Sequence, residues 1–173
     1  MSADAGQARS LHFVRDEDLM LTQGGIHAAT QAWCADWGIP ATELKVQCRE
    51  VQLADRDAAW ARIGEKCQFW AETEVDLPSR LYQWLLGRAP AALPIPAADA
   101  SVVGDLVRGA EQALLASLTG SLLHRLAPTG GGDAATAPPA AWFERFAGCV
   151  VTQVSVAGHC VVRLLTHLDA RPV

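Results

Sequence analysis

The sequence predicts an α+β fold in which a mainly antiparallel sheet packs against two long helices. Two segments, 16–37 and 98–126, carry apolar residues at steps of three and four, which is typical of amphipathic helices. Shorter segments alternate apolar and polar residues, or are dense in Val, Leu and Thr, as strands are. Helices and strands that follow one another in this order indicate an α+β domain.

The length of the chain bounds its organisation. A chain of 173 residues with 50% hydrophobic residues and six tryptophans suits one domain with a substantial core. We expect a flexible tail at 1–15 and a single domain at 16–173. Within that domain, residues 127–139 are rich in Gly, Ala and Pro and predict a flexible loop.

Charge and hydropathy exclude several function classes. The net charge is −5 and the 14 Lys and Arg residues are scattered, which argues against nucleic acid as a partner. No apolar run approaches the roughly 18 residues that a membrane span needs, and the first residues lack a signal-peptide core. We therefore predict a cytoplasmic location without membrane insertion. Five cysteines without CxxC spacing favour reduced thiols.

Local patterns place the elements of the first half. Helix 16–37 ends at Gly38, and Gly24 with Gly25 is a candidate break within it. Segment 43–53 alternates as a strand until Val51 and Leu53 change the parity, which indicates a bulge or the strand end. Residues 55–62 read as a charged connection. A second strand is expected at 66–73, followed by a short helix that Gly87 closes and a proline-bearing connector at 88–97.

Two segments dominate the second half. The long helix 98–126 is expected to bury a broad stripe of apolar residues: Val102, Val103, Leu106, Val107, Ala110, Ala113, Leu114, Leu118 and Leu122. Segments 149–156 and 160–168 flank a turn at 157–159 that contains Gly158, so an antiparallel hairpin is predicted.

The sequence predicts no catalytic, cofactor-binding or metal site. Cys149, His159, Cys160 and His167 include two adjacent residues that would point to opposite faces of a strand, which prevents simple convergence on a metal. The acidic run of Glu72, Glu74 and Asp76 has the ligand type of a Mg²⁺ site, but a solvated turn is the commoner explanation. The glycines at 130–132 lack the preceding strand and the Lys-Ser/Thr of a phosphate loop.

One aromatic cluster is a candidate for partner binding. Trp142, Phe143 and Phe146 follow the Gly/Pro-rich loop, and large aromatic residues are enriched at binding hot spots. We expect this cluster to be the most exposed one and to contact another protein. The alternative is that the three side chains cover the end of the chain's own sheet.

The order of elements resembles a known family. A strand–helix unit ending in VDLPSRLYQWLLGR, a proline-bearing connector, the helix ADASVVGDLVRGAEQALLASLTGSLL and the hairpin GCVVTQVSVAGHCVVRLL are similar to the middle region of FliM and SctQ. These proteins are the flagellar motor switch component and its type III secretion counterpart. The resemblance implies a CheC-like fold.

Two departures from the family pattern matter. CheC-type phosphatases carry Glu and Asn three residues apart on such a helix, whereas here Glu111 is followed by Leu114 at the Asn position. The resemblance also implies a C-terminal surface-presentation domain, for which no residues remain after Val173. Two alternatives stay open, a split or shortened homologue and a longer protein of which this sequence lacks that domain.

Two functional hypotheses follow. The first is a non-enzymatic interaction component of a bacterial type III secretion sorting platform or a flagellar switch-type assembly, with other proteins of that assembly as partners and oligomer formation as an option. The alternative is a small cytoplasmic enzyme that uses a Cys or a carboxylate, without a cofactor.

Overall fold

A five-stranded antiparallel sheet in the order β1-β4-β5-β3-β2 forms the centre of the fold. The structure is a computed structural model that describes residues 16–63, 69–86, 100–123, 138, 140–144 and 148–167. The predicted tail 1–15, the connector 88–97 and the loop 127–139 except Pro138 lie outside these residues. The elements in chain order are α1 (Asp16–Trp37), β1 (Lys45–Glu50), η2 (Leu53–Asp57), β2 (Ala61–Ile63), β3 (Phe69–Thr73), α2 (Leu77–Leu86), α3 (Ala100–Leu123), η4 (Ala140–Phe143), β4 (Cys149–Val156) and β5 (His159–His167).

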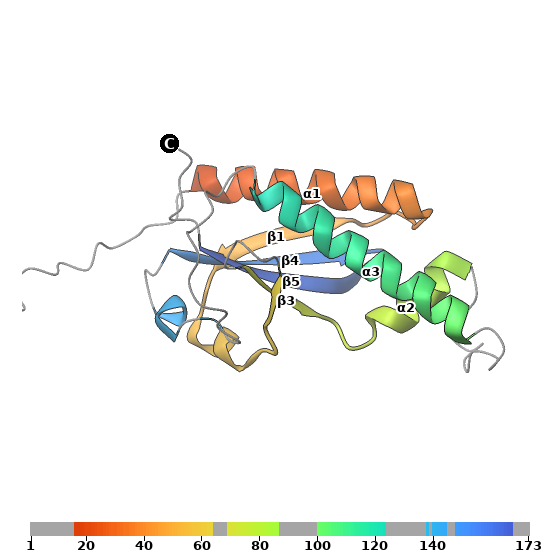
Figure 1. Cartoon of the computed structure of the whole chain (residues 1–173). Helices are drawn as coiled ribbons and strands as arrows, with labels where there is room; N and C mark the ends of the chain where they lie inside the picture. The colour runs from red at the N-terminus through yellow and green to blue at the C-terminus, as the bar shows by residue number, and fades with distance from the viewer. Residues whose placement is uncertain are drawn as a thin grey trace, which may run out of the picture.

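The sheet separates two layers of unequal thickness. The long helices α1 and α3 lie side by side over one face, and α2 packs beside α3 (Figure 1). The short 3-10 helices η2 and η4 contact each other and lie on the side of the sheet away from α1 (Figure 1). This arrangement confirms the predicted fold class of an antiparallel sheet against two long helices. The face of the sheet opposite α1 and α3 is called the underside below.

The first helix matches its predicted range. Three acidic residues occupy its first turn, where the helix dipole favours negative charge. Gly38 takes a positive φ of 66° directly after the helix, and the Ile39 amide bonds back to the carbonyl of Cys34 at 2.8 Å. The helix runs unbroken through Gly24 and Gly25, so the candidate break is not realised.

The long helix α3 buries a narrower stripe than predicted. Val107, Ala110, Leu114 and Leu118 are buried, at steps of three and four residues. Val102 is 72% exposed and Leu106 is 39% exposed, so the prediction that they belong to the buried stripe was wrong. These two residues lie on the side of the helix next to the buried stripe, which begins at Val107.

A hydrogen bond from a buried tryptophan joins α1 to α3. The indole Nε1 of Trp33 in α1 donates a hydrogen bond of 2.9 Å to the backbone carbonyl of Ala110 in α3. Trp33 is only 1% exposed, so its indole N–H needs a partner inside the protein.

The strands confirm most of the predicted pattern. β1 ends at Glu50, where the alternation breaks, and β3 (Phe69–Thr73) lies within the predicted strand 66–73. The hairpin β4–β5 turns at Ala157 and Gly158, both at positive φ (51° and 78°), as a tight two-residue hairpin turn requires. The three-residue strand β2 and the helix η2 lie where a charged connection was predicted, because both are too short to show a periodicity.

Two separate clusters fill the two faces of the sheet. The larger lies between the sheet and the helices and includes Ile26, Trp33, Leu81, Leu114, Leu118, Val154, Val162 and Leu164. The smaller lies on the underside and consists of Trp60, Trp70, Phe143, Cys149, Val151 and Leu165, with Val51, Ala58 and Trp142 packed against it. We call it the underside cluster. Both faces of the central hairpin are therefore buried at one end, which explains the density of Val and Leu in β4 and β5.

Candidate interaction surface

The underside of the sheet has an apolar part and a polar part. Cross-strand partners share a face in an antiparallel sheet, and Val151 of β4, Leu165 of β5 and Trp70 of β3 stand in one such row. All three are almost completely buried, because η2 and η4 cover this end of the sheet. The covering elements come from distant parts of the chain.

Two of the three predicted partner-binding residues, Trp142 and Phe143, lie in this covering layer. Phe143 is 5% exposed and belongs to the underside cluster, so the expectation that it is exposed was wrong. Trp142 is half-buried, and its ring packs edge-on against that of Trp70, with centroids 5.0 Å apart and planes at 84°. Phe146 lies outside the described residues. Binding of a partner by these residues stays a prediction.

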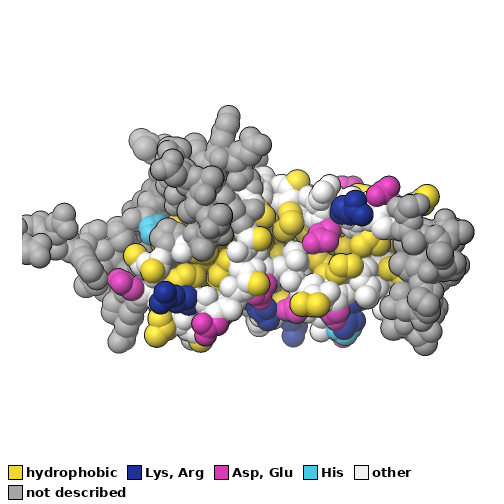
Figure 2. Space-filling model, turned by 60° about the horizontal axis from the view of Figure 1, so that its bottom comes forward, with side chains coloured by type: hydrophobic (Ala, Val, Ile, Leu, Met, Phe, Trp, Pro, Cys, Tyr) yellow, Lys and Arg dark blue, Asp and Glu magenta, His cyan; other side chains and the backbone are white. Residues whose placement is uncertain are grey.

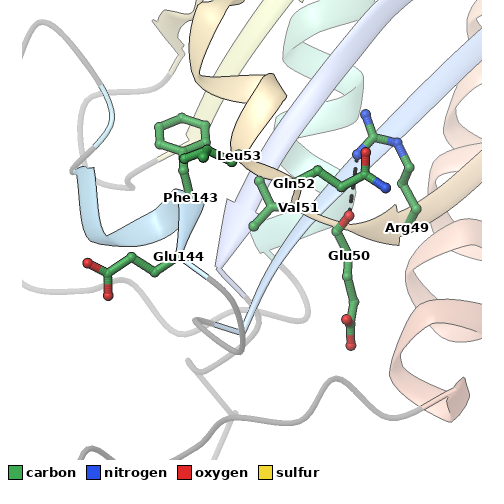
Figure 3. A pocket seen from close by; sticks show the side chains of 7 residues that line it. All are labelled: Arg49, Glu50, Val51, Gln52, Leu53, Phe143 and Glu144. Carbon is green, nitrogen blue, oxygen red and sulfur yellow. Dashed lines mark hydrogen bonds between the residues drawn. The ribbon is translucent and has the colours of Figure 1, made fainter.

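An open groove lies between the end of β1 and η4. Seven residues line this groove of about 800 Å³: Arg49, Glu50, Val51, Gln52, Leu53, Phe143 and Glu144. Figure 3 shows Leu53 next to the ring of Phe143, with Val51 directed toward them. Leu53 is 71% exposed, so its side chain is open to solvent at this pocket. We call this pocket the β1–η2 groove.

Asp55 holds the β1–η2 side of the groove in place. Its carboxylate accepts two hydrogen bonds from the Arg49 guanidinium, at 2.7 and 2.6 Å, and a third of 2.7 Å from the backbone N–H of Gln52. Its backbone carbonyl accepts the indole N–H of Trp60 at 2.7 Å. One residue thus joins β1, the start of η2 and the underside cluster.

The electrostatics of Asp55 follow from these contacts. Burial raises the pKa of the carboxyl, but the hydrogen bonds from Arg49 and from the Gln52 amide, with the charges of Arg49 and Arg163, outweigh burial and hold the pKa below its ordinary value. The pKa of Arg49 is raised, chiefly by its hydrogen bond to Asp55. Both groups therefore stay charged at neutral pH.

A polar row crosses the other part of the underside. Gln47, Gln153, Arg163 and Glu72 are successive cross-strand partners on β1, β4, β5 and β3. Arg163 Nη1 lies 2.8 Å from Glu72 Oε1 and 3.0 Å from a carboxylate oxygen of Glu74. Glu72 also accepts the Ala59 amide at 2.7 Å, which ties the start of β2 to β3.

These ion pairs bear on the acidic run that resembled a Mg²⁺ site. Glu72 and Glu74 are paired with Arg163, and Asp76 is paired with Arg80 at 3.0 Å. Carboxylates engaged by arginine are poor candidates for a cation. Among the residues that the structure describes, no group of three or more His, Cys, Asp or Glu residues is arranged to hold a metal ion.

The cysteines and histidines of the hairpin do not converge. Cys149 stands opposite His167 at one end of the β4–β5 ladder, whereas His159 and Cys160 lie next to the turn at the other end. Burial raises the pKa of the Cys34, Cys48 and Cys160 thiols, to about 11 for Cys160. Thiols with raised pKa are weak nucleophiles at neutral pH because little thiolate is present.

The surface of the underside carries charges of both signs. Figure 2 shows acidic and basic side chains interspersed with apolar ones over the described part of this face, with no large patch of one sign. Such a surface lacks the clustered positive charge that binds a phosphate backbone. None of the helices within the described ranges has the length and apolar character needed to cross a membrane.

Comparison with known proteins gives similarity of fold. The sequence matches no protein-family model and no curated protein. Among solved structures, the chain is similar to the FliM middle domain from H. pylori, with 10% identity, a TM-score of 0.45, and coverage of 89% of this chain and 93% of that one. It is also similar to FliY of Thermotoga maritima, with 12% identity, a TM-score of 0.48, and coverage of 91% and 93%.

One of the two structures is a FliM middle domain, and FliM is also one of the proteins that the order of elements resembles. The identities and TM-scores are too low for the similarity to support a function. A function has to be supported by the residues of this chain.

Of the residues that line the groove, the sequence analysis singled out Phe143 but none of those from Arg49 to Leu53. The residues from Arg49 to Leu53 were read only as the end of a strand. The available signal was the change of parity at Val51 and Leu53, because an apolar residue that falls out of register at a strand end has to pack elsewhere or stay exposed. Leu53 stays exposed, beside Phe143.

Proposed function

We propose that this chain is a non-enzymatic protein–protein interaction component of a bacterial cytoplasmic assembly of the flagellar-switch or type III secretion sorting-platform kind. The observation that carries the proposal is the order of elements. A leading helix, a strand and short helix ending in VDLPSRLYQWLLGR, a long helix and a Val-rich hairpin occur in the order that resembles the FliM and SctQ middle region. Proteins of such assemblies act through the surfaces that they present to each other.

The side chains favour binding over catalysis. Leu114 occupies the position where a CheC-type phosphatase carries its Asn, and it is fully buried in the core, three residues after Glu111. The thiols of Cys34, Cys48 and Cys160 have raised pKa values. Both features oppose the alternative of a small enzyme based on a catalytic carboxylate–amide pair or a thiolate.

We further propose that the partner contacts the β1–η2 groove, beside the segment 142–146. Phe143 forms one wall of the groove and Leu53 offers an exposed aliphatic side chain at it. The polar contacts of Asp55 keep the opposite wall in a fixed position, so the groove is formed before a partner arrives. A preformed groove with an exposed apolar residue is a typical docking feature.

Deletion of the gene in its native host tests the proposed function. We expect loss of motility if the assembly is flagellar, or loss of type III secretion if it is secretory, with recovery when the wild-type chain is supplied. A swimming assay and an assay of secreted proteins measure the two outcomes in the same strain. Normal motility together with normal secretion in the deletion strain contradicts the proposal.

Thiol labelling tests the enzyme alternative. The experiment follows each of the five thiols of the wild-type chain with a bulky maleimide at pH 7.5, by mass spectrometry of the labelled peptides. We expect slow labelling that accelerates on unfolding, because burial raises the pKa values of Cys34, Cys48 and Cys160. One thiol that reacts faster than free cysteine favours the enzyme.

A further inference from the structure

Strand β1 is the longer of the two edge strands of the sheet. The sheet order β1-β4-β5-β3-β2 places β1 and β2 at its edges, and β1 has six residues whereas β2 has three. An edge strand presents backbone N–H and C=O groups on its outer side, where a further strand can pair with it. Because a short strand offers few such groups, β1 is the better edge for an added strand.

The hydrogen bonds of β1 show which of its residues face outward. The amide of Val51 donates to the carbonyl of Cys149 at 3.1 Å, and this pair continues the β1–β4 register. Residues of an antiparallel strand alternate between hydrogen-bonded and non-hydrogen-bonded pairs. The odd-numbered residues of β1 therefore bond with β4, and the even-numbered ones direct their N–H and C=O groups outward. The outward residues include Val46 and Cys48, with Leu44 directly before the strand.

The outward groups form a run that is bounded at both ends. The carbonyl of Thr42 accepts the amide of Ala157 at 2.9 Å, and the carbonyl of Glu50 accepts a hydrogen bond of 3.3 Å from Arg49 Nη1. Between them, no hydrogen bond to another described residue engages the outward backbone groups of the segment 44–48. This segment is therefore the part of the edge that is ready to pair.

We propose that a second copy of this chain pairs with β1 through the segment 44–48 and joins the two sheets into one. The two segments run antiparallel about a two-fold axis that passes through Val46, so residue 44 of one copy faces residue 48 of the other. Outward groups then meet outward groups, as an antiparallel ladder requires. We call this contact the β1–β1 joint. The inference goes beyond the proposed function and does not depend on it.

The side chains favour this register over its neighbours. It places the exposed Lys45 of each copy opposite the exposed Gln47 of the other. Moving the centre from Val46 to Lys45 brings the two Lys45 side chains face to face, and moving it to Gln47 places Lys45 opposite Arg49. Like charges that face each other across two strands are destabilising. Larger moves in either direction need the backbone carbonyls that already accept hydrogen bonds from Ala157 and Arg49.

The two β1–η2 grooves lie apart in such a dimer. Because the paired strands are antiparallel, the ends of the two β1 strands, and with them residues 51–53 of each groove, lie at opposite ends of the joint. Dimer formation and partner binding at the groove are therefore separate properties that separate experiments test.

Analytical ultracentrifugation of the full-length chain tests the inference. We expect a concentration-dependent equilibrium between monomer and dimer. Gln47→Lys places like charges opposite each other twice in each dimer, so it should raise the dissociation constant about tenfold, whereas Gln47→Glu should lower it several-fold. Gln112→Lys, the same substitution at an exposed position of α3, is the matched control and should stay within about twofold of wild type. Circular dichroism confirms that each variant is folded.

Cysteine pairing tests the register of the β1–β1 joint. Residues 45 and 47 form a non-hydrogen-bonded pair in the new ladder, with Cα atoms about 4.5 Å apart, which a disulfide can bridge. We therefore expect that oxidation of a mixture of Lys45→Cys and Gln47→Cys chains gives the mixed disulfide. The two symmetric disulfides should be minor products, because their Cα atoms lie about 7 to 8 Å apart on the diagonal. Mass spectrometry identifies the linked peptides.

Three results would overturn the inference. A chain that sediments as a monomer up to about 0.1 mM does not form the joint. A dimer that ignores both substitutions at position 47, or that Gln112→Lys weakens as much as Gln47→Lys does, is held by another surface. Symmetric disulfides as the main products contradict the pairing about Val46. The motility and secretion assays test the proposed function separately, so failure of one proposal is distinguishable from failure of the other.

Discussion

The two faces of the sheet are covered by different kinds of structure. On the helix side, α1, α2 and α3 bury mainly aliphatic side chains in one continuous cluster. On the underside, two short 3-10 helices bury mainly aromatic rings, and polar contacts through Asp55 and Glu72 tie the covering segments to the sheet.

The helix side and the underside differ in how completely the sheet is covered, and we expect this to give them different roles. Regular helices cover their face so completely that Leu114, Leu118, Val154 and Leu164 are inaccessible. The short elements of the underside leave the β1–η2 groove open and Leu53 exposed at it. We therefore expect the helix side to carry most of the folding free energy and the underside to carry the contact with a partner.

The largest expected effect is on the helix side. Leu114→Ala should lower the free energy of unfolding by about 2 to 5 kcal/mol, because it removes a fully buried side chain and leaves a cavity. Denaturant unfolding measures the loss. The matched control is Arg108→Ala on the same helix, whose side chain is 68% exposed and which should change stability by less than about 0.5 kcal/mol. Similar losses in both variants would mean that the buried face of α3 is assigned incorrectly.

An intermediate effect is expected in the underside cluster. Trp142→Ala should cost about 1 to 2 kcal/mol of unfolding free energy, because Trp142 is half-buried and packs edge-on against Trp70. Trp142→Phe should retain part of this ring contact and serves as the control. Thermal and denaturant unfolding measure the change. A normal melting temperature for Trp142→Ala, together with a loss of partner affinity of about 2 kcal/mol, would instead assign this residue to the interface.

The smallest effect concerns the polar link that supports the groove. Asp55→Asn should lower the free energy of unfolding by about 1 kcal/mol at pH 7. The substitution weakens the hydrogen bond that caps the start of η2 and removes an ion pair with Arg49 that is partly screened by solvent. The folded-state pKa of Asp55 is depressed, so its contribution is complete above the unfolded-state pKa near 4 and is lost as the pH falls through the folded value.

Unfolding at several pH values checks the sign of this effect. The difference between wild type and Asp55→Asn should be constant from pH 7 to about 5 and should shrink below about pH 4. Asp57→Asn, at an exposed position of the same short helix, is the control for the loss of one carboxylate from this helix. A difference that grows toward acid pH contradicts the proposed role of Arg49 and Gln52 as the groups that depress the pKa.

The same comparison explains what the sequence could predict. The helix side is built from long periodic segments, so α1, most of the α3 stripe and the β4–β5 hairpin follow from spacing alone. The underside is built from η2, η4 and β2, which are shorter than one period of any reliable pattern. Their packing depends on contacts between residues far apart in sequence, such as Trp70 with Trp142, and no local rule brings these together.

The candidate site shows the same limit at single residues. Composition marked Trp142 and Phe143 as candidate anchors, because large aromatic residues are enriched at binding hot spots. It could not show that Phe143 is buried, since exposure depends on whether η2 covers it. Leu53 drew attention only as a break in alternation, and its role at the groove depends on the ion pair of Arg49 with Asp55 that positions η2.

Site-specific photo-cross-linking in the native host tests the central claim most directly, namely that the underside groove is where this chain meets its partner. A photoreactive amino acid replaces Leu53 in one strain and Val75, which is 98% exposed at the β3–α2 turn, in another. We predict a cross-link from position 53 to a component of a flagellar or type III secretion assembly, and no such product from position 75. Cross-links of equal yield from both positions, or none from position 53 in cells where the assembly is active, would contradict the account.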